Sequence, residues 1–187
     1  MATGGPADDF MTPQNRPSLL VMVTPITASQ AAAQANGVKI TTVEMDRVLP
    51  TVKSINYMGA IMAVEAAKAQ GAVEAVYRTP DGLLTEGTRA NLFVFKGNQL
   101  ITAQKDVLAG ITRAVVFEIA EDDFEVIEGT VHYDDIINGV VDEIFITSST
   151  KEILPVVQVD DYQIGNGKPG PKTEKLLALF HTYVENY

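Results

Sequence analysis

The pattern of apolar and polar positions predicts short strands and helices in mixed order along the first part of the chain. The apolar run at residues 19–23 is typical of a buried strand, and the alternation over residues 38–43 predicts a second one. Residues 29–36 between them are rich in alanine, so we expect a short helix there that Gly37 closes. Residues 1–17 are rich in Gly, Pro and Asp, which indicates a tail or linker.

A longer helix is expected from about residue 54 to residue 70. Gly71 supplies a stop at its end, because glycine readily adopts the conformation that terminates a helix. Large apolar side chains recur at helical spacing, and we expect the inner face of this helix to be formed by Ile55, Met58, Ile61, Met62 and Ala66.

After residue 70 the pattern changes to hairpins with helices between them. Strands are expected at residues 73–78 and 83–86, joined by a turn at residues 79–82. Strands and helices in mixed order, with several hairpins and no internal repeat, indicate a mixed α/β (α+β) class. The remaining expected elements are a hairpin at residues 91–95 and 99–102, a helix at 111–120, a strand at 124–128, a short helix near 134–138, a buried strand at 143–147, a hairpin near 156–164 and a final helix.

Composition and charge narrow the classes of partner. A chain of 187 residues is within the range of one globular domain, and its formal net charge of −10 repels a phosphate backbone, so we expect no nucleic acid partner. With no cysteine and only 2 histidines, we expect neither a disulfide framework nor a metal site. No apolar run is long enough to cross a bilayer, and the first residues lack the layout of a signal peptide, so we expect a cytoplasmic protein without a membrane partner.

Polar residues at the ends of the expected elements are the candidates for chemistry. Lys53 lies at the start of the apolar helix, with the phenol of Tyr57 shortly after it. Taken alone, such a lysine is usually solvated, with its stem on apolar surface and its ammonium in water. Glu86 opens a polar stretch between two strands, for which a plain turn is the commoner explanation.

Two further stretches are suited to an anion. Gly110 stands immediately before a helix, so the free N–H groups of Ile111 and Thr112 and the positive end of the helix dipole favour a phosphate, although simple capping is more common. Ser148 and Ser149 follow a buried strand, and such hydroxyls are also frequent in ordinary caps. None of these stretches is specific by itself.

Together, these stretches fit the requirements of pyridoxal 5′-phosphate. The aldehyde of this cofactor bonds a lysine amine, a carboxylate keeps its pyridine nitrogen protonated, and its phosphate needs anion-binding turns. Lys53, Glu86 and the two turns supply these groups, and the phenol of Tyr57 is suited to hydrogen-bond the 3-hydroxyl of the ring.

The same motifs resemble the class IV aminotransferases. This is the fold-type IV pyridoxal phosphate family, which includes branched-chain aminotransferases, D-amino acid aminotransferases and aminodeoxychorismate lyase. The resemblance extends from about residue 19 to the C-terminus and implies the large domain of that fold, a sheet or pseudo-barrel flanked by helices. It is carried by K-S-I-N-Y at residues 53–57, E-G at 86–87 with N-L-F at 91–93, L at 108 with G-I-T-R at 110–113, and S-S-T-K-E at 148–152 with P-V at 155–156.

The resemblance also implies roles for individual residues. Lys53 is the catalytic lysine that bonds the cofactor, Glu86 is the partner of the pyridine nitrogen, and Leu108 packs on one face of the ring. Thr150 lies near the substrate carboxylate. The phosphate is held through the amides of Ile111 and Thr112 and through Ser148 and Ser149.

Some features depart from the family pattern. The stretch between residues 102 and 108 is slightly shorter than in the family, which affects the placement of Leu108. Arg89 stands where many members carry a small residue, and it either binds an acidic group of the substrate or points into solvent. We expect the small N-terminal domain of the family to be absent, so that residues 1–17 are an inter-domain linker or tail and residues 18–187 are the large cofactor-binding domain.

The resemblance implies a pyridoxal phosphate-dependent aminotransferase. It would move an amino group from a branched-chain L-amino acid or a D-amino acid to a 2-oxo acid such as 2-oxoglutarate. The expected assembly is a homodimer, and a separate small N-terminal domain is a further candidate partner. Two alternatives stay open: a lyase of the aminodeoxychorismate type, which shares lysine, cofactor and fold, and an inactive fragment or interaction module. We expect low activity from this chain alone.

Overall fold

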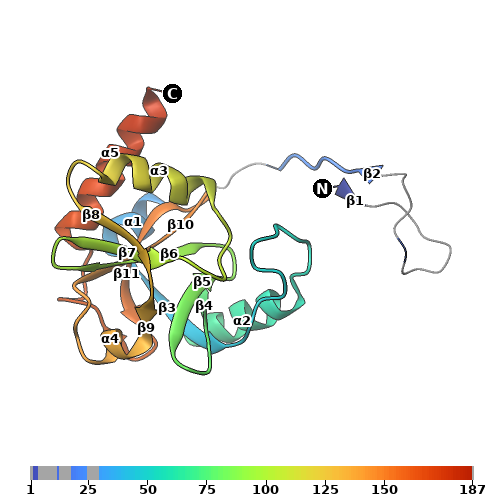
Figure 1. Cartoon of the computed structure of the whole chain (residues 1–187), viewed down its shortest axis with the longest axis horizontal. Coiled ribbons are helices and arrows are strands. Elements are labelled where there is room, and N and C mark those ends of the chain that lie inside the picture. The colour runs from blue at the N-terminus through green and yellow to red at the C-terminus, as the bar shows by residue number, and fades with distance from the viewer. Residues whose placement is uncertain (1, 4–11, 13–17, 25–29, 187) are drawn as a thin grey trace.

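The centre of the molecule is a β-sheet that closes on itself (Figure 1). The structure is a computed structural model that describes residues 2–3, 12, 18–24 and 30–186. The closed part contains β3 (Val38–Glu44), β4 (Ala75–Arg78), β5 (Leu83–Gly87), β6 (Asn91–Lys96), β10 (Glu143–Ser148) and β11 (Glu152–Val159). Neighbouring strands follow the order β6–β10–β11–β3–β4–β5, and the pairing of Glu86 with Asn91 joins β5 back to β6.

The barrel combines parallel and antiparallel pairs. β3 lies parallel to both β11 and β4, whereas the other pairs of the ring are antiparallel. Parallel neighbours need a crossover connection, and α2 (Met58–Ala69) lies in the crossover from β3 to β4. The remaining described strands are β7 (Gln99–Ala103) and β8 (Glu125–Gly129) beyond β6, β9 (Val131–His132) beside β5, β12 (Tyr162–Gln163) beside β11, and the separate pair β1 (Ala2–Thr3) and β2 (Ser18–Leu19).

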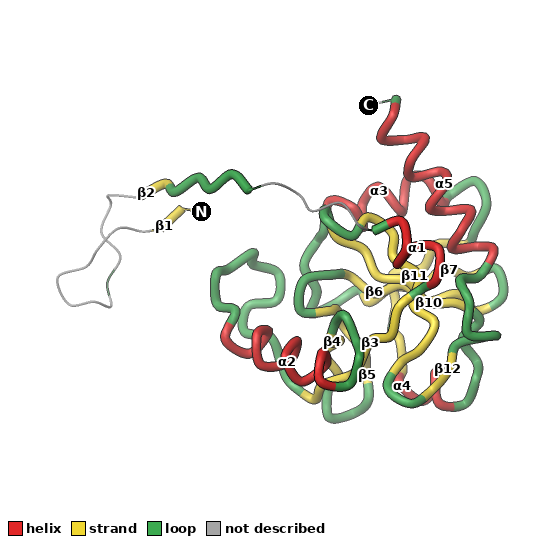
Figure 2. The backbone as a smooth tube through the Cα atoms, turned by 180° about the vertical axis from the view of Figure 1, so that it is seen from behind, coloured by secondary structure: helices red, strands yellow, loops and turns green. Residues whose placement is uncertain are grey.

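Helices pack against the outside of the barrel. α3 (Ile111–Ala120) and α5 (Pro171–Glu185) contact each other and β10, and α5 also contacts β11. α2 contacts β3 and β4, and Figure 2 shows it well apart from α3 and α5. Two short helices complete the set in the described residues: α1 (Ala31–Asn36), which contacts β11, and α4 (Tyr133–Ile137), which follows β9.

Strand β6 is buried on both faces, which explains its continuous apolar sequence. Leu92 and Val94 belong to the core that the barrel strands share, whereas Phe93 and Phe95 belong to a second core under α3 and α5. Phe93 stacks on Phe145 of β10, with ring centroids 4.9 Å apart. A strand that is covered on both sides shows no polar alternation. β6 is therefore fixed from both sides.

Most of the expected elements are confirmed. The helix expected at residues 111–120 is α3, and the hairpins expected within residues 73–86 and 91–102 are β4–β5 and β6–β7. Gly37 follows α1 with a φ of 71°, a conformation that favours glycine. The mixed α/β class with a barrel-like sheet is confirmed. Residue 29 of the first expected helix, and most of the expected tail at residues 1–17, lie outside the described residues.

The expected inner face of α2 is wrong. The helix begins at Met58 and not near residue 54, and the residues expected inside are exposed: Ile55, Met58, Ile61, Met62 and Ala66. Small residues face the sheet instead, because a helix face without long side chains can lie close to the strands. These buried residues are Ala60, Ala63, Val64 and Ala67. The large apolar side chains consequently form an outward surface on α2.

The buried strand expected at residues 19–23 is also wrong. β2 contains only Ser18 and Leu19 and pairs with β1, and the exposed fraction of Val23 is 91%. Figure 1 shows this segment extending away from the barrel. An apolar run shows that a segment prefers burial, but not which surface covers it. Among the described residues, no helix has the length and apolar character needed to cross a membrane.

Candidate active site

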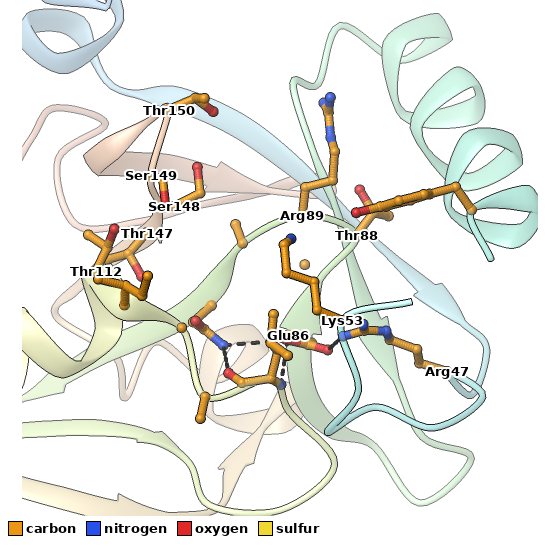
Figure 3. A pocket seen from close by; sticks show the side chains of 18 residues that line it. Arg47, Lys53, Glu86, Thr88, Arg89, Thr112, Thr147, Ser148, Ser149 and Thr150 are labelled. Carbon is orange, nitrogen blue, oxygen red and sulfur yellow. Dashed lines mark hydrogen bonds and ion pairs between the residues drawn. The ribbon is translucent and has the colours of Figure 1, made fainter. Parts of the chain in front are cut away.

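The site residues expected from the sequence lie around one cavity of about 440 Å³. The cavity forms where the loop after β3, the turn between β5 and β6, the start of α3 and the turn between β10 and β11 meet (Figure 3). All of the expected residues line its wall: Lys53, Tyr57, Glu86, Arg89, Leu108, Ile111, Thr112, Ser148, Ser149 and Thr150. Segments that are far apart in the sequence therefore form a single site.

Glu86 is the fixed acid of this cavity. It is 3% exposed at the end of β5, and its carboxylate pairs with the guanidinium of Arg47. The backbone N–H of Leu108 donates to Glu86 Oε2 over 2.9 Å, and Asn91 Nδ2 lies 3.4 Å from the same oxygen. Asn91 Nδ2 also donates to the carbonyl oxygen of Leu108 over 2.9 Å. Partners from three segments of the chain therefore hold the carboxylate in one orientation.

Burial raises the pKa of the Glu86 carboxyl above its ordinary value of 4.5, because the charged form loses its hydration. The N–H of Leu108 and the guanidinium of Arg47 stabilise the carboxylate and lower the pKa, but burial outweighs them. A cationic N–H group that enters the cavity and lies against Glu86 would favour the ionised carboxylate.

Lys53 lies in the loop between β3 and α2, and not at the start of the helix as expected. Its side chain is exposed, and Figure 3 shows it on the same side of the cavity as Glu86 and Arg47. Its ammonium group has no ion-pair or hydrogen-bond partner among the described residues. An amine in this position is accessible to an electrophile in the cavity.

Another part of the wall carries hydrogen-bond donors suited to an anion. α3 begins after Gly110, which has an extended backbone. No side chain at this position caps the helix. The first amides of the helix, at Ile111 and Thr112, therefore lack partners within the helix. Ser148 is the last residue of β10 and Ser149 begins the turn after it, and Figure 3 shows both near Thr112. A helix N-terminus beside several hydroxyls favours a phosphate group.

The sequence analysis assigned no role to one buried hydroxyl on this wall. Thr147 is 1% exposed and lines the cavity, and its Oγ1 has no hydrogen-bond partner among the described residues. An unpaired buried hydroxyl costs about 1–3 kcal/mol, so a ligand that supplies the partner would remove this cost. The donors on this wall fit a phosphate, and we call them the phosphate seat: the amides of Ile111 and Thr112 and the hydroxyls of Thr147, Ser148 and Ser149.

Three of the expected residues lie at the exposed rim of the cavity. Arg89 is exposed, and Figure 3 shows its guanidinium directed away from Glu86. Tyr57 is 37% exposed and is the residue that precedes α2. Thr150 is exposed in the turn between β10 and β11. These side chains are accessible to a molecule that enters from solvent.

Sequence reasoning assigned no role to Arg47 or Asn91. Arg47 lies in an irregular loop 39 positions before its partner Glu86, and no periodic signal marks it. Asn91 is the first residue of a strand, where only the neighbours in space distinguish a buried amide from a solvated one. No cluster of three or more His, Cys, Asp or Glu side chains that could hold a metal ion lies within the described part of the chain.

Comparisons with known proteins identify relatives of this chain. The sequence model of the Amino-transferase class IV family matches residues 1–159. The D-alanine aminotransferase of Bacillus licheniformis is 36% identical over 155 residues, which are 81% of this chain and 54% of that protein. A putative branched-chain-amino-acid aminotransferase of Methanocaldococcus jannaschii is 32% identical over 187 residues, which are 96% of this chain and 64% of that protein.

A solved structure shares the fold. A branched-chain amino acid aminotransferase of T.th., complexed with N-(5′-phosphopyridoxyl)-L-glutamate, matches with a TM-score of 0.76 and 29% identity. The match covers 83% of this chain and 54% of that one. This chain thus spans between about half and two thirds of the length of the relatives that it matches.

The fold and the cavity define a barrel-like α/β protein with a lysine, a buried carboxylate and a phosphate seat in one site. The relatives are named as aminotransferases, and the solved structure shares the fold. The chain belongs to the class IV aminotransferase family, and the resemblance noted in its sequence is confirmed.

Proposed function

We propose that this chain carries the cofactor site of a pyridoxal 5′-phosphate-dependent aminotransferase. The observation that carries the proposal is the single cavity in which Lys53, Glu86 and the phosphate seat come together. Membership of the class IV family supports the same activity, and so do relatives that are named as aminotransferases.

The residues of the cavity fit the groups of this cofactor. When bound, pyridoxal phosphate supplies an aldehyde that bonds an amine and a ring that accepts electrons from the substrate. Glu86 would accept the hydrogen bond of the ring N–H, and Leu108 would pack on one face of the ring. Tyr57 would bind the ring 3-hydroxyl, and the phosphate seat would bind the phosphate.

Lys53 is the proposed catalytic residue. Its exposed amine would hold the cofactor covalently, and after release it would carry a proton from the substrate Cα to C4′, the former aldehyde carbon of the cofactor. Glu86 acts through charge: it is buried and paired with Arg47, so it stays fixed while its carboxylate keeps the ring nitrogen protonated.

The proposed substrates are a branched-chain L-amino acid or a D-amino acid, with a 2-oxo acid such as 2-oxoglutarate as acceptor. Relatives named for both kinds of amino acid support this choice. At the exposed rim, Thr150 is the proposed contact of the substrate carboxylate, and Arg89 is the proposed contact of an acidic group of the substrate. None of the three relatives described above is named as a lyase or as an inactive module.

We also propose that residues 18–187 form the large cofactor-binding domain, that residues 1–17 are an inter-domain linker or tail, and that the domain forms a homodimer. The outward surface of α2 supports an interface, because Met58, Ile61 and Met62 are 75%, 56% and 64% exposed. A small N-terminal domain, in the same chain or separate, is the second candidate partner that could cover this surface. The proposed location is the cytoplasm. Sedimentation of the purified protein tests the dimer.

Covalent trapping tests the proposed function. Pyridoxal 5′-phosphate is added to the purified chain and reduced with borohydride, and the labelled peptide is identified by mass spectrometry. We expect a yellow protein with the label on Lys53. A label on another lysine, with Lys53 unmodified, would overturn the assignment of the site. A panel of L- and D-amino acids with 2-oxoglutarate then measures amino-group transfer and identifies the donor.

A further inference from the structure

A buried ion pair lies directly behind the cavity wall and has no part in the proposed chemistry. Glu74, between α2 and β4, has an exposed fraction of 0%, and its Oε2 pairs with the ammonium of Lys151. Its Oε1 accepts hydrogen bonds from the hydroxyl of Thr88 and, over 3.2 Å, from the N–H of Ala75. The side chain of Lys151 is only 16% exposed, so the pair is largely removed from water.

Glu74 packs under the turn between β5 and β6. A Cβ added to Gly87 would lie 3.1 Å from Glu74 Cγ, so the stem of the glutamate lies directly against this turn. Thr88 is held twice, because its hydroxyl donates to Glu74 and its N–H donates to the carbonyl oxygen of Ala75 over 2.9 Å. Gly87 and Thr88 both line the cavity. Glu74 therefore fixes this part of the cavity wall.

Lys151 has the same relation to the turn between β10 and β11. Its backbone N–H donates to the carbonyl oxygen of Ser148 over 3.2 Å and lies 3.1 Å from the hydroxyl oxygen of Ser148. This bond closes the turn that contributes Ser148 and Ser149 to the phosphate seat. The side chain of Lys151 leaves the turn and reaches Glu74, so one ion pair connects two parts of the cavity wall.

We propose that Glu74 and Lys151 are positioning residues whose ion pair fixes the β10–β11 turn relative to the β5–β6 turn and thereby holds the phosphate seat in its binding geometry. The inference rests on the proposed function, because it concerns the binding of pyridoxal 5′-phosphate. Neither side chain is among the described residues that line the cavity, so the pair acts through the turns and not by direct contact.

A stabilising role alone explains this pair poorly. Removing two charges from water costs much of what their attraction returns, and apolar residues of similar volume are often equally stable. An ion pair with further hydrogen bonds has one property that apolar contacts lack, because it sets a distance and a direction. The pair lies between two turns of the cavity wall, where a set distance and direction would hold one turn relative to the other.

The test compares pyridoxal 5′-phosphate with pyridoxal, which lacks the phosphate. Both compounds are titrated into the unchanged chain and into Lys151→Met, and binding is followed by absorbance and by borohydride trapping on Lys53. We expect the affinity of Lys151→Met for pyridoxal 5′-phosphate to fall about tenfold, the effect of one charge-assisted contact, while its affinity for pyridoxal stays unchanged. Lys151→Arg keeps a cation within reach of Glu74. It should therefore keep most of the affinity for pyridoxal 5′-phosphate, relative to that for pyridoxal, which Lys151→Met loses.

Lys96→Met is the matched control. Lys96 and Asp135 form another partly buried ion pair, with side chains 23% and 26% exposed, and neither residue lines the cavity. We expect this variant to bind both compounds like the unchanged chain. Thermal melting shows whether each variant is folded, and Lys151→Gln, which keeps a hydrogen-bond donor, replaces Lys151→Met in the same comparison if the latter does not fold.

Each outcome decides the inference. An equal loss of affinity for both compounds would show that the pair only stabilises the fold, and no loss for either would show that the turns are held without it. Both results overturn the inference. Failure of the proposed function gives a different result, because the unchanged chain would then form no adduct at Lys53 with either compound, and the inference would fail with it.

Discussion

Glu86 and Asn91 form the residue pair that closes the barrel, and both line the cavity. The amide of Asn91 lies between Glu86 Oε2 and the carbonyl oxygen of Leu108, so it also connects the loop before α3 to the sheet. The closure of the fold and the geometry of the site therefore depend on the same side chains.

Replacing Asn91 with alanine should affect both the stability of the fold and the binding of the cofactor. The change removes the donor shared by Glu86 and Leu108, so we expect the free energy of unfolding to fall by about 1–3 kcal/mol. Affinity for pyridoxal 5′-phosphate should fall as well, because Glu86 loses a partner that orients it. Urea unfolding and ligand titration measure the two effects. Asn98→Ala, in an exposed turn, is the control, and an unfolding curve like that of the control would contradict the prediction.

Glu86 should make the free energy of unfolding of the chain depend on pH, and the direction of the change can be stated. Burial raises the pKa of its carboxyl above 4.5, so between 4.5 and the raised value the folded chain binds more protons than the unfolded chain. The contribution of Glu86 to the free energy of unfolding therefore falls as the pH rises through this window, and is constant above it. Urea unfolding of the chain without cofactor at a series of pH values measures the slope.

Glu86→Gln should remove that slope, because an amide does not titrate. Glu125→Gln changes an exposed glutamate and should leave the slope in place. If Glu86→Gln and the unchanged chain respond to pH in the same way, the buried carboxyl is not the source of the pH dependence.

The same Glu86→Gln variant should transfer amino groups more slowly. A neutral amide cannot stabilise a protonated ring nitrogen, so we expect the rate, already low for this chain alone, to fall by roughly 10²-fold or more, with weaker retention of the cofactor. The rate is measured with the best donor amino acid and 2-oxoglutarate. Turnover at the unchanged rate would mean that Glu86 is only a turn residue.

Thr147→Val should have effects of opposite sign on stability and on binding. The hydroxyl of Thr147 is buried and has no partner among the described residues, so its removal should raise the free energy of unfolding of the cofactor-free chain by about 1 kcal/mol. The same change should lower affinity for pyridoxal 5′-phosphate about tenfold, because the phosphate loses a donor. Thr102→Val is the contrast: its hydroxyl donates to the carbonyl oxygen of Leu92 over 2.6 Å, so its loss should destabilise the chain. A loss of stability in Thr147→Val would contradict the prediction.

Lys53→Ala should leave the fold intact and abolish covalent labelling by pyridoxal 5′-phosphate. The side chain is exposed and has no partner among the described residues, so little packing is lost. Circular dichroism and thermal melting check the fold, and borohydride trapping checks the label. Lys105→Ala, another exposed lysine, should label like the unchanged chain.

Local signals in the sequence predicted much of the fold and the site. Gly110 followed by an amphipathic segment marks the start of α3. The signal is local, because the glycine and the first apolar residues of the helix lie within a few positions of each other. The stretches that contain the expected site residues could be located for a similar reason, since each lies at the end of an expected element, whereas the roles of Leu108 and Thr150 came from the resemblance to the family. The cavity brings all of these stretches together.

Relations between distant positions could not be predicted in this way. The partners of Arg47 and Lys151 lie 39 and 77 positions away, and no local pattern connects them. The orientation of α2 was predicted wrongly because hydrophobicity favours Met58 and Met62 for burial, whereas the close approach to the sheet requires small residues such as Ala63. Which face is covered depends on distance between elements, and a single segment does not contain that information.

The order of the cavity segments along the chain has a consequence for synthesis. Lys53 and Glu86 leave the ribosome well before Ser148 and Ser149. A nascent chain that stops before β10 has the amine and the carboxylate, but it lacks three of the five residues of the phosphate seat and the two strands that connect β6 to β3. The phosphate seat is thus complete only after β10 and β11 have been made, so we expect the nascent chain to bind pyridoxal 5′-phosphate only after the synthesis of these strands and not when Lys53 emerges.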